Sequence, residues 1–238
     1  MKIGIIGNGK MGAELQDAAL EKRLEVTLPD TVLREEDQLS FPSQPDILID
    51  FSHPDNLDKL LSFSLSNQLP LVIGTTGYTK EQLQAIKDHA QHVPVLYSAN
   101  FSLGIMVMNQ LVGQAAALLH NWQIELIEKH HSQKKDAPSG TAEQLLHTIQ
   151  NVRNLQPIHN WQGKKREEEQ IGVHSIRAGS FPGEHEVLFA GPDEVFTIKH
   201  EAFSSRIFAL GALQAASWLK DQSPGSYKLE DLLINEGV

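Results

Sequence analysis

The sequence predicts an α/β protein built in two parts, and two observations support this. In the first hundred residues, apolar runs of strand length alternate with stretches of helix length, which is typical of βαβ units and a parallel sheet. Beyond about Ser102 the alternation stops, and a long apolar helix precedes several strand-like runs, as in an α+β unit. The 238 residues, 40% of them hydrophobic, suffice to bury a core in one large domain or two small ones.

The first part is expected to hold five strands that alternate with three helices. Residues 46–52 form the clearest strand, because four of the five residues from Ile47 to Phe51 are apolar. The helix after it carries Pro54 in its first turn, where proline is tolerated. The next helix opens with Thr79 and Gln82, which resembles a capping box. The predicted strands are residues 2–6, 25–28, 46–52, 70–77 and 93–102, and the predicted helices are residues 12–20, 53–68 and 79–92.

The second part is expected to combine three helices with strands that pair antiparallel. Two strand-like runs, residues 172–179 and 185–202, look antiparallel, with a turn near Gly191-Pro192-Asp193. A polar loop of mixed charge, residues 160–170, precedes them. A further strand is expected at residues 122–131, and helices are expected at residues 103–119, 140–152 and 206–220.

Composition limits the class of protein. The formal net charge of -10 disfavours nucleic acid as a partner, because binding to a phosphate backbone needs a basic surface. No cysteine is present, so disulfides and thiolate metal sites are excluded. The N-terminal residues lack the apolar region and cleavage site of a signal peptide, and no apolar run approaches the ~20 residues of a membrane span. We therefore expect a cytoplasmic protein with no membrane partner.

A glycine-rich turn follows the first predicted strand. Residues Gly7-Asn8-Gly9-Lys10-Met11-Gly12 fit the pattern G-x-G-x-x-G between a strand and a helix. The first glycine permits the tight turn, the second lets the backbone approach a pyrophosphate, and the third lets helix and strand pack closely. The phosphates then bind at the helix N-terminus. This context favours a Rossmann-type dinucleotide site over an incidental glycine turn.

The cofactor's identity is left open by the residues beyond this turn. The ribose-binding acid expected about 20 residues further on is not obvious, and two charged residues, Asp30 and Arg34, lie near that distance. An acid there favours NAD, whereas an arginine favours NADP, and either charge could instead be a solvated loop residue.

Two later strand ends carry residues suited to the same ligand. Ligands of open α/β sheets bind outside the carboxyl ends of the strands. Thr75 and Thr76, in the turn from Gly74 to Gly77, could bind ribose or the nicotinamide amide, or could belong to an ordinary turn. Asn100 offers a donor and an acceptor to an amide, and Phe101 could pack on a nicotinamide ring or lie in the core.

The stretch "EKHHSQKKDAPSGTA", residues 128–142, is the strongest candidate for a reactive site. Residues 129–135 hold three lysines and no acid in an otherwise acidic chain. His130 and His131 close a predicted strand, where consecutive side chains point to opposite faces. A histidine alone is usually structural, and a zinc site with Asp136 and His185 is the other alternative, although no spaced ligand framework supports it.

The same stretch also contains groups that could bind anions. Pro138-Ser139-Gly140-Thr141 opens a predicted helix, so the N–H groups of Gly140 and Thr141 could bind a carboxylate, while Ser139 could cap the helix. Lys134 could pair with a carboxylate or deliver a proton. The segment therefore indicates a dicarboxylate site with an acid attached.

At this point the chain resembles a known family, the 4-hydroxy-tetrahydrodipicolinate reductases, also called dihydrodipicolinate reductases. The resemblance is carried by "IEKHHSQKKDAPSGTA" and by "GNGKMG", "IDFSHP", "VIGTTG", "SANFSLG", "IRAGSFPGEH" and "HEAFSSR", and it covers nearly the whole chain. It implies a nucleotide-binding domain at residues 1–101 with 207–238. It implies a substrate-binding and tetramerisation domain with a mixed sheet at residues 102–206.

The resemblance also implies roles for individual residues. His130 and Lys134 match the proton-transferring pair, His131 matches a substrate ligand, and Gly140 with Thr141 match the carboxylate-binding pair. The implied cofactor is NADH or NADPH, and no metal is implied. Its contacts would be Gly7, Asn8, Gly9, Lys10, Met11, Gly12, Gly74, Thr75, Thr76, Ser98, Ala99, Asn100 and Phe101, with Arg34 as a stand-in for the family's arginine.

The resemblance implies reduction of 4-hydroxy-tetrahydrodipicolinate to tetrahydrodipicolinate in lysine and diaminopimelate biosynthesis, by a homotetramer acting on a small dicarboxylate. Two other functions remain open. One is a different NAD(P)-dependent oxidoreductase of similar plan, acting on sugars or amino acids, which would not need the His-His-Lys stretch. The other is a nucleotide sensor without activity, which would be expected to lack His130 or Lys134.

Overall fold

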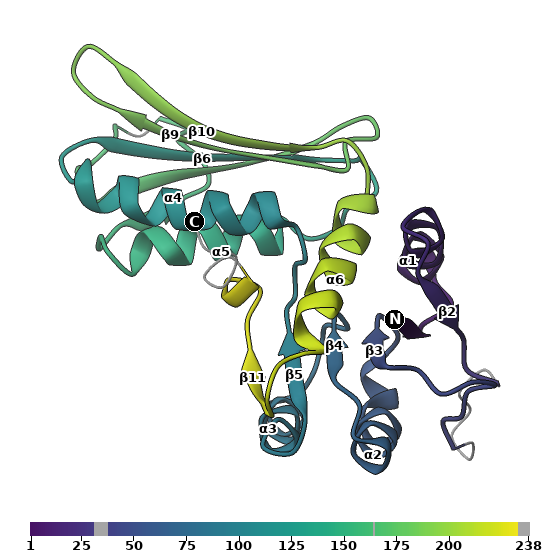
Figure 1. The fold of residues 1–238 in the computed structure, drawn as a ribbon. Helices are drawn as coiled ribbons and strands as arrows, with labels where there is room; N and C mark the ends of the chain where they lie inside the picture. Colours follow the sequence, from purple (N-terminus) through teal and green to yellow (C-terminus); the bar gives the residue numbers. More distant parts are fainter. Residues whose placement is uncertain (31–37, 164, 233–238) are drawn as a thin grey trace. The chain divides into compact units, whose positions relative to one another are not determined.

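In the computed structural model, the described residues are 1–30, 38–163 and 165–232, and they form two compact units (Figure 1). The first unit comprises Met1–Ser102 and Ser205–Val238, and the second comprises Leu103–Ser204. Each unit has its own sheet and its own cluster of buried apolar side chains. The sequence-based prediction of an α/β fold with a parallel sheet and a separate mixed sheet is confirmed.

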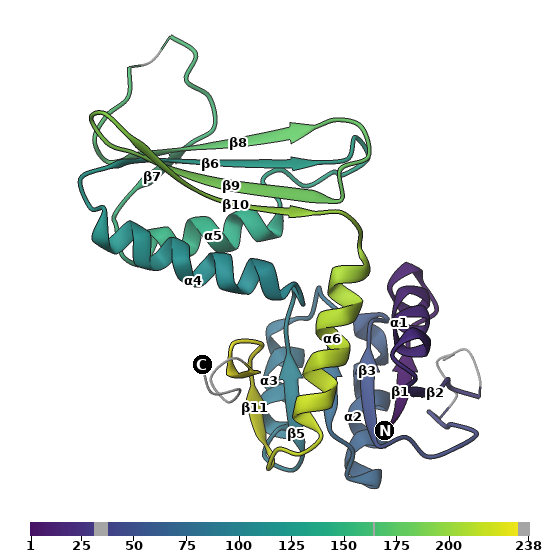
Figure 2. The same ribbon diagram turned by 45° about the horizontal axis from the view of Figure 1, so that its top comes forward.

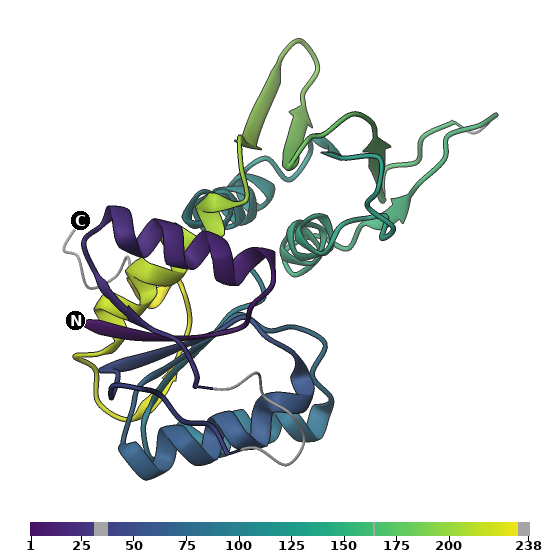
Figure 3. The ribbon, with the colours of Figure 1, turned by 90° about the vertical axis from the view of Figure 1, so that its right-hand side faces the viewer.

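The first unit is a parallel sheet covered on both faces. The strands pair in the order β11-β5-β4-β3-β1-β2, and every pair is parallel. Helices α1 and α6 lie on one face and α2 and α3 on the other (Figure 3). The strands are β1 (Lys2–Ile6), β2 (Glu25–Thr27), β3 (Ile47–Asp50), β4 (Leu71–Ile73), β5 (Pro94–Tyr97) and β11 (Gly225–Tyr227), and the helices are α1 (Lys10–Glu21), α2 (Leu57–Asn67), α3 (Lys80–His89) and α6 (Arg206–Leu219).

Burial explains why these strands form. Every residue of β3 and β4 is buried, as expected where helices cover both faces of a parallel sheet.

The order of the strands reverses at β1, which lies between β2 and β3. Ligands of such sheets bind outside the strand ends at this reversal.

Helix boundaries follow local side-chain chemistry. Thr79 accepts the N–H of Gln82, and the Gln82 side chain accepts the N–H of Thr79, so the predicted capping box is confirmed. The helix predicted at residues 53–68 is instead a short 3-10 turn, Pro54–Asn56, followed by α2. The His53 ring accepts the N–H of Asp55 at 3.4 Å and starts that turn.

The second unit is a mixed sheet with two helices on one face (Figures 1 and 2). Strands run in the order β10-β9-β6-β8-β7, and β6 pairs antiparallel with β9 and parallel with β8. Apolar side chains of α4 and α5 pack with those of β6, β8 and β9 in one core cluster. The elements are α4 (Leu103–Leu118), β6 (Gln123–His130), α5 (Gly140–Gln150), β7 (Gln156–Ile158), β8 (Gln170–Arg177), β9 (Gly183–Ala190) and β10 (Val195–Ala202).

The strand pairing in this unit corrects the sequence-based prediction. The turn near Gly191-Pro192-Asp193 joins β9 to β10, which pair antiparallel. β8 does not join that pair, because β6 lies between β8 and β9. The run at residues 185–202 was therefore a complete hairpin, and two short strands, β7 and β11, were missed because their residues are largely polar or exposed. Within the described residues, no helix is long and apolar enough to cross a membrane.

Candidate active site

The glycine turn between β1 and α1 has the geometry that its sequence pattern predicts. Gly7 has φ of +120°, and a Cβ there would lie 2.2 Å from the carbonyl oxygen of Phe51. A Cβ at Gly12 would lie 1.9 Å from the carbonyl oxygen of Gly7, so helix and turn are in close contact. A Cβ at Gly9 would meet nothing within 4 Å. Two of the glycines are thus needed for the fold, and the space beside the third is open.

The N-terminus of α1 is suited to a phosphate. Gly9 is its N-cap residue and makes no side-chain cap, and the first turn holds no acidic residue. N–H groups of a first turn have no partner within the helix, and the helix dipole favours an anion there. A cavity of about 570 Å³ adjoins this turn, and its walls include Gly7, Asn8, Gly9 and Asp30. Asp30 therefore faces the space predicted for the cofactor, whereas Arg34 lies outside the described residues.

A second cavity of about 600 Å³ lies at the ends of β3 and β4. Met11, Gly74, Thr75 and Thr76 line it, and all four are among the residues predicted to contact the cofactor. Both cavities are also lined by three residues that sequence reasoning did not assign: Phe51, Ser52 and His53. They follow β3 directly, so the rule that ligands bind at strand ends could have identified them.

Asp50, at the end of β3, organises this edge. The side-chain hydroxyls of Ser52 and Thr75 each donate to its carboxylate at 2.6 Å, and Thr75 also accepts the backbone N–H of Ser52 at 2.8 Å. Burial raises the pKa of Asp50, and the hydrogen bonds from Ser52, Thr75 and Tyr78 oppose that rise. The Thr75 hydroxyl is thus engaged in hydrogen bonds with Asp50 and Ser52, while Thr76 is exposed.

The segment after β5 forms a tight turn. The Ser98 hydroxyl donates to the carbonyl of Asn100 at 2.6 Å, and the Asn100 side chain accepts the N–H of Ser102 at 2.8 Å. Ala99 is exposed. Phe101 is only 1% exposed, and its ring packs against Phe51 with the centroids 5.5 Å apart. Of the two roles left open for Phe101, the structure supports a core position.

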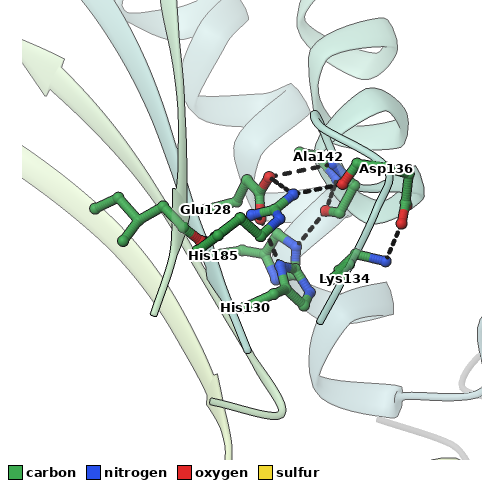
Figure 4. A network of polar contacts seen from close by, with 9 residues as sticks. Glu128, His130, Lys134, Asp136, Ala142 and His185 are labelled. Atoms are coloured by element: carbon green, nitrogen blue, oxygen red, sulfur yellow. Dashed lines mark hydrogen bonds and ion pairs between the residues drawn. The ribbon is translucent and has the colours of Figure 1, made fainter. Parts of the chain in front are cut away.

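His130 occupies a buried, charged setting at the end of β6 (Figure 4). Its Nδ1 lies 2.5 Å from Oε2 of Glu128, and Arg177 donates two hydrogen bonds to the same carboxylate. Burial lowers the pKa of His130, Glu128 acts against this change, and the positive charges of Lys134 and Arg177 add to it. These effects together favour the neutral form of the His130 ring.

The loop after β6 carries the predicted lysine. The backbone N–H of His131 donates to the carbonyl of Phe181 at 2.9 Å, and the N–H of Lys134 donates to the carbonyl of His131 at 3.1 Å. The Lys134 ammonium lies 2.8 Å from a carboxylate oxygen of Asp136 (Figure 4). This pairing lowers the pKa of Asp136. The lysine is thus held in the same loop as His131, which is partly exposed.

The start of α5 holds Gly140 and Thr141, the two residues predicted to bind a carboxylate. The Ser139 hydroxyl accepts the N–H of Ala142 at 3.2 Å, so Ser139 is the N-cap of α5. Gly140 is exposed, and a Cβ there would meet nothing within 4 Å. Gly140 and Thr141 are the first two residues of α5, the end of the helix where the dipole favours an anion.

His185, proposed from sequence only as a zinc ligand, belongs to the same buried cluster. Its Nε2 lies 3.0 Å from the Ser139 hydroxyl, and its ring packs edge-on to that of His130 with centroids 5.2 Å apart. Burial lowers its pKa to about 4. Among the described residues, no group of three or more histidine or acidic side chains is arranged to hold a metal ion.

Glu128 and Arg177 were not assigned from sequence. The signal for Glu128 was present, because β6 buries alternate residues and Glu128 falls among Ile124, Leu126 and His130. A carboxylate at a buried position needs a partner. Arg177 is that partner, and it comes from β8, whose place beside β6 the sequence did not predict.

One unit of the chain has a Rossmann-type sheet with an uncapped helix N-terminus, and the other carries a buried histidine and a nearby lysine. These features are those of a dinucleotide-dependent oxidoreductase. Two family models divide the chain between them: Dihydrodipicolinate reductase, N-terminus, matches residues 1–101, and Dihydrodipicolinate reductase, C-terminus, matches residues 104–233. The chain belongs to the dihydrodipicolinate reductase family, as its motifs indicated.

Individual relatives agree with this assignment. The chain is 37% identical over 235 residues to the 4-hydroxy-tetrahydrodipicolinate reductase of Rickettsia africae, covering 98% of each chain. It is 49% identical over 193 residues to that of Exiguobacterium sibiricum, covering 80% of this chain and 78% of the relative. A solved structure, dipicolinate-bound dihydrodipicolinate reductase from Paenisporosarcina sp. TG-14, matches with a TM-score of 0.77 and 25% identity over 96% of this chain and 97% of that one.

Proposed function

We propose that this protein uses His130 and Lys134 to carry out the reaction of its family. The chain is an NAD(P)H-dependent oxidoreductase that reduces 4-hydroxy-tetrahydrodipicolinate to tetrahydrodipicolinate in lysine biosynthesis. The observation that carries this conclusion is similarity over the whole length of a reductase, from the glycine turn to the His-His-Lys stretch. A nucleotide sensor would not need a buried histidine whose ring is held by a carboxylate.

The first unit fits a dinucleotide. Open space beside Gly9, an uncapped helix N-terminus and the adjoining cavity would together receive the pyrophosphate. Thr76 and the residues after β3 would contact the rest of the cofactor. When bound, the reduced nicotinamide supplies a hydride to the ring of the substrate.

The second unit fits a dicarboxylate. Dipicolinate, named as the bound molecule in the Paenisporosarcina structure, is a ring with two carboxylates. A ligand of this class in a relative supports a dicarboxylate substrate for this protein. The first-turn N–H groups of Gly140 and Thr141 would hold one carboxylate, and His131 and Lys134 would hold the other. Lys134 would then exchange its contact with Asp136 for one with the ligand.

The reaction also needs a proton on the carbon next to the one that receives the hydride, and it releases water. The Nε2 atom of His130 is the candidate carrier, because Nδ1 is engaged by Glu128. The negative charge of a bound dicarboxylate raises the pKa of a neighbouring imidazole, so substrate binding favours protonation of His130. Lys134 would supply a second proton source in the same loop.

Three finer points are part of this proposal. Exposed apolar side chains of the second unit, including Ile176, Phe181 and Val195, support a homotetramer formed through this unit. Asp30, on the wall of the first cavity, supports use of NADH. A cytoplasmic location stays a prediction, supported by the biosynthetic role.

The test is an initial-rate assay. A coupled synthase would supply the substrate from pyruvate and aspartate semialdehyde, and the loss of reduced-nicotinamide absorbance would be followed with NADH and with NADPH. Oxidation that depends on the synthase product is expected. If the Asp30→Ala variant loses kcat/KM for NADH while keeping that for NADPH, Asp30 selects the cofactor. A folded protein that binds either cofactor but oxidises neither would contradict the proposed function.

A further inference from the structure

Glu128 is a charged group in a place where charge is costly. Its side chain is 0% exposed, and it lies on β6 two residues before His130, on the same face of the strand. An ionised carboxylate without water is strongly destabilising unless it is paired and hydrogen-bonded. Packing alone therefore does not explain why a glutamate occupies this position.

Arg177, at the end of β8, forms the ion pair that compensates the buried charge of Glu128. Its two terminal nitrogens donate to the two carboxylate oxygens of Glu128 at 2.6 and 2.9 Å, a bidentate pair. Burial acts to raise the pKa of Glu128, but hydrogen bonds from Arg177, Ser175 and His130 outweigh it, and the pKa is lowered. Glu128 is thus an anion at neutral pH.

An anionic Glu128 determines which nitrogen of His130 carries a proton. A carboxylate only accepts hydrogen bonds, so Nδ1 of His130, 2.5 Å from Oε2 of Glu128, must be the protonated nitrogen of the neutral ring. Nε2 then presents a lone pair. A Cβ at residue 183 would lie 3.1 Å from this Nε2, and the glycine found there leaves that side of the ring uncrowded.

We propose that Glu128 is a positioning residue for the reaction: its carboxylate, held by Arg177, orients the His130 ring and fixes Nε2 as the atom that takes up and releases the proton. This inference rests on the proposed function, in which His130 transfers that proton. It assigns no contact between Glu128 and the substrate, so Glu128 acts only through His130.

The charges around His130 determine the effect of removing Glu128. Four groups face the ring or act on it: Glu128 from β6, Arg177 from β8, His185 from β9 and Lys134 from the following loop. Glu128 is the only anion among these four, and it raises the pKa of His130, while Lys134 and Arg177 lower it. Loss of its charge lowers that pKa further, so the protonated form needed for donation persists only at lower pH.

The central variant is Glu128→Gln, which keeps the size of the side chain and removes the charge. Since a positioned acid–base group is worth roughly 100- to 10,000-fold in rate, we expect kcat to fall at least about 10-fold with little change in KM. The basic limb of the kcat profile should move to lower pH by about one unit or more. The matched control is Glu125→Gln, which removes a carboxylate from the same strand that binds Arg166 and His174 instead. Its pH profile should match that of the wild type.

A second measurement, the tautomer of His130 in the wild type, depends neither on activity nor on the folding of Glu128→Gln. Nitrogen-15 NMR of the wild-type protein, with the His130 signal assigned by its loss in His130→Gln, reports the tautomer and the pKa of this ring. The expected result is the Nδ1–H tautomer, with a lower pKa in Glu128→Gln where that variant is folded. An Nε2–H tautomer in the wild type, or a kcat profile unmoved in a folded Glu128→Gln, would overturn the inference. A wild-type protein with the Nδ1–H tautomer but no reductase activity would contradict the proposed function and leave the positioning of His130 intact.

Discussion

The Ser139 hydroxyl joins a helix cap to a buried histidine: its oxygen accepts the N–H of Ala142 at 3.2 Å and lies 3.0 Å from Nε2 of His185. Both side chains are at least 96% buried. Among the described residues, Nδ1 of His185 has no hydrogen-bond partner, so the contact of Nε2 with Ser139 is the hydrogen bond that holds this ring. One serine thus caps α5 and binds the buried histidine that packs against His130.

The first prediction is that Ser139→Ala destabilises the protein more than the loss of a cap alone. The variant loses an N-cap and leaves a buried imidazole without a partner, so the free energy of unfolding should fall by about 2 to 3 kcal/mol. Urea-induced unfolding measures this value. The control is Thr79→Ala, which removes the exposed cap of α3 and should cost about 1 kcal/mol. Equal losses in the two variants would show that the contact with His185 contributes nothing.

A second prediction concerns stability against pH. The pKa of His185 is lowered by burial to about 4 in the folded protein, against its ordinary value of 6.5 in the unfolded chain. Between these values the unfolded chain binds more protons, so the contribution is fully present above 6.5 and is lost as pH falls toward 4. We expect about 2 kcal/mol of this loss between about pH 7 and about pH 5.

The pKa values of other histidines are lowered as well, so the test uses a difference between two proteins. The pKa values of His130 and His200 are also lowered, chiefly by burial. Unfolding free energies of the wild type and of His185→Asn, each measured by urea titration at both pH values, isolate the part that belongs to His185. The variant should show the smaller dependence on pH, and parallel curves would rule out the assignment to His185.

The third prediction separates the two roles of glycine in the turn after β1. Gly9→Ala should leave the unfolding free energy nearly unchanged, because its φ of -81° suits alanine and a Cβ meets nothing within 4 Å. The same Cβ would enter the space assigned to the pyrophosphate, so the Kd for NADH or NADPH should rise at least about 10-fold. Fluorescence titration of the reduced cofactor measures this Kd.

The matched variant is Gly12→Ala, whose Cβ would lie 1.9 Å from the carbonyl oxygen of Gly7. This overlap forces α1 away from the turn, and we expect the unfolding free energy to fall by about 1 to 3 kcal/mol. If Gly9→Ala binds the cofactor as tightly as the wild type, the phosphates do not bind at the N-terminus of α1.

The first unit was largely predictable because its signals are local. β3 and β4 are short runs of buried residues that are apolar except for Asp50. The capping box at Thr79 needs only residues three apart, and the glycine turn lies between a strand and a helix. The second unit depended on long-range pairing. The sequence grouped residues 172–179 with 185–202, but β6 separates β8 from β9.

That pairing error explains which site residues were missed. His130 and Lys134 share one short stretch and were assigned from it. Arg177 reaches Glu128 only because β6 and β8 are neighbours, 49 residues apart in sequence, and His185 reaches Ser139 from β9. Side chains that orient a reactive group come from neighbouring strands, so they cannot be found before the strand order is known.

The last prediction tests the role of Lys134. Its side chain is partly exposed and pairs with Asp136, whose side chain is 58% exposed, and such pairs contribute little to stability. Lys134→Ala should therefore change the unfolding free energy by no more than about 0.5 kcal/mol. If Lys134 shares the acid role with His130, kcat should fall by roughly 100-fold.

The kinetic pattern decides between the two roles open to this lysine. A lysine that only binds a carboxylate equally in the ground and transition states would raise KM and leave kcat unchanged, whereas an acid would lower kcat itself. Lys135→Ala is the control, because the adjacent lysine is exposed and removal of its charge changes the net charge equally. An unchanged kcat in Lys134→Ala would limit Lys134 to carboxylate binding and leave His130, oriented by Glu128, as the one proton carrier assigned in this stretch.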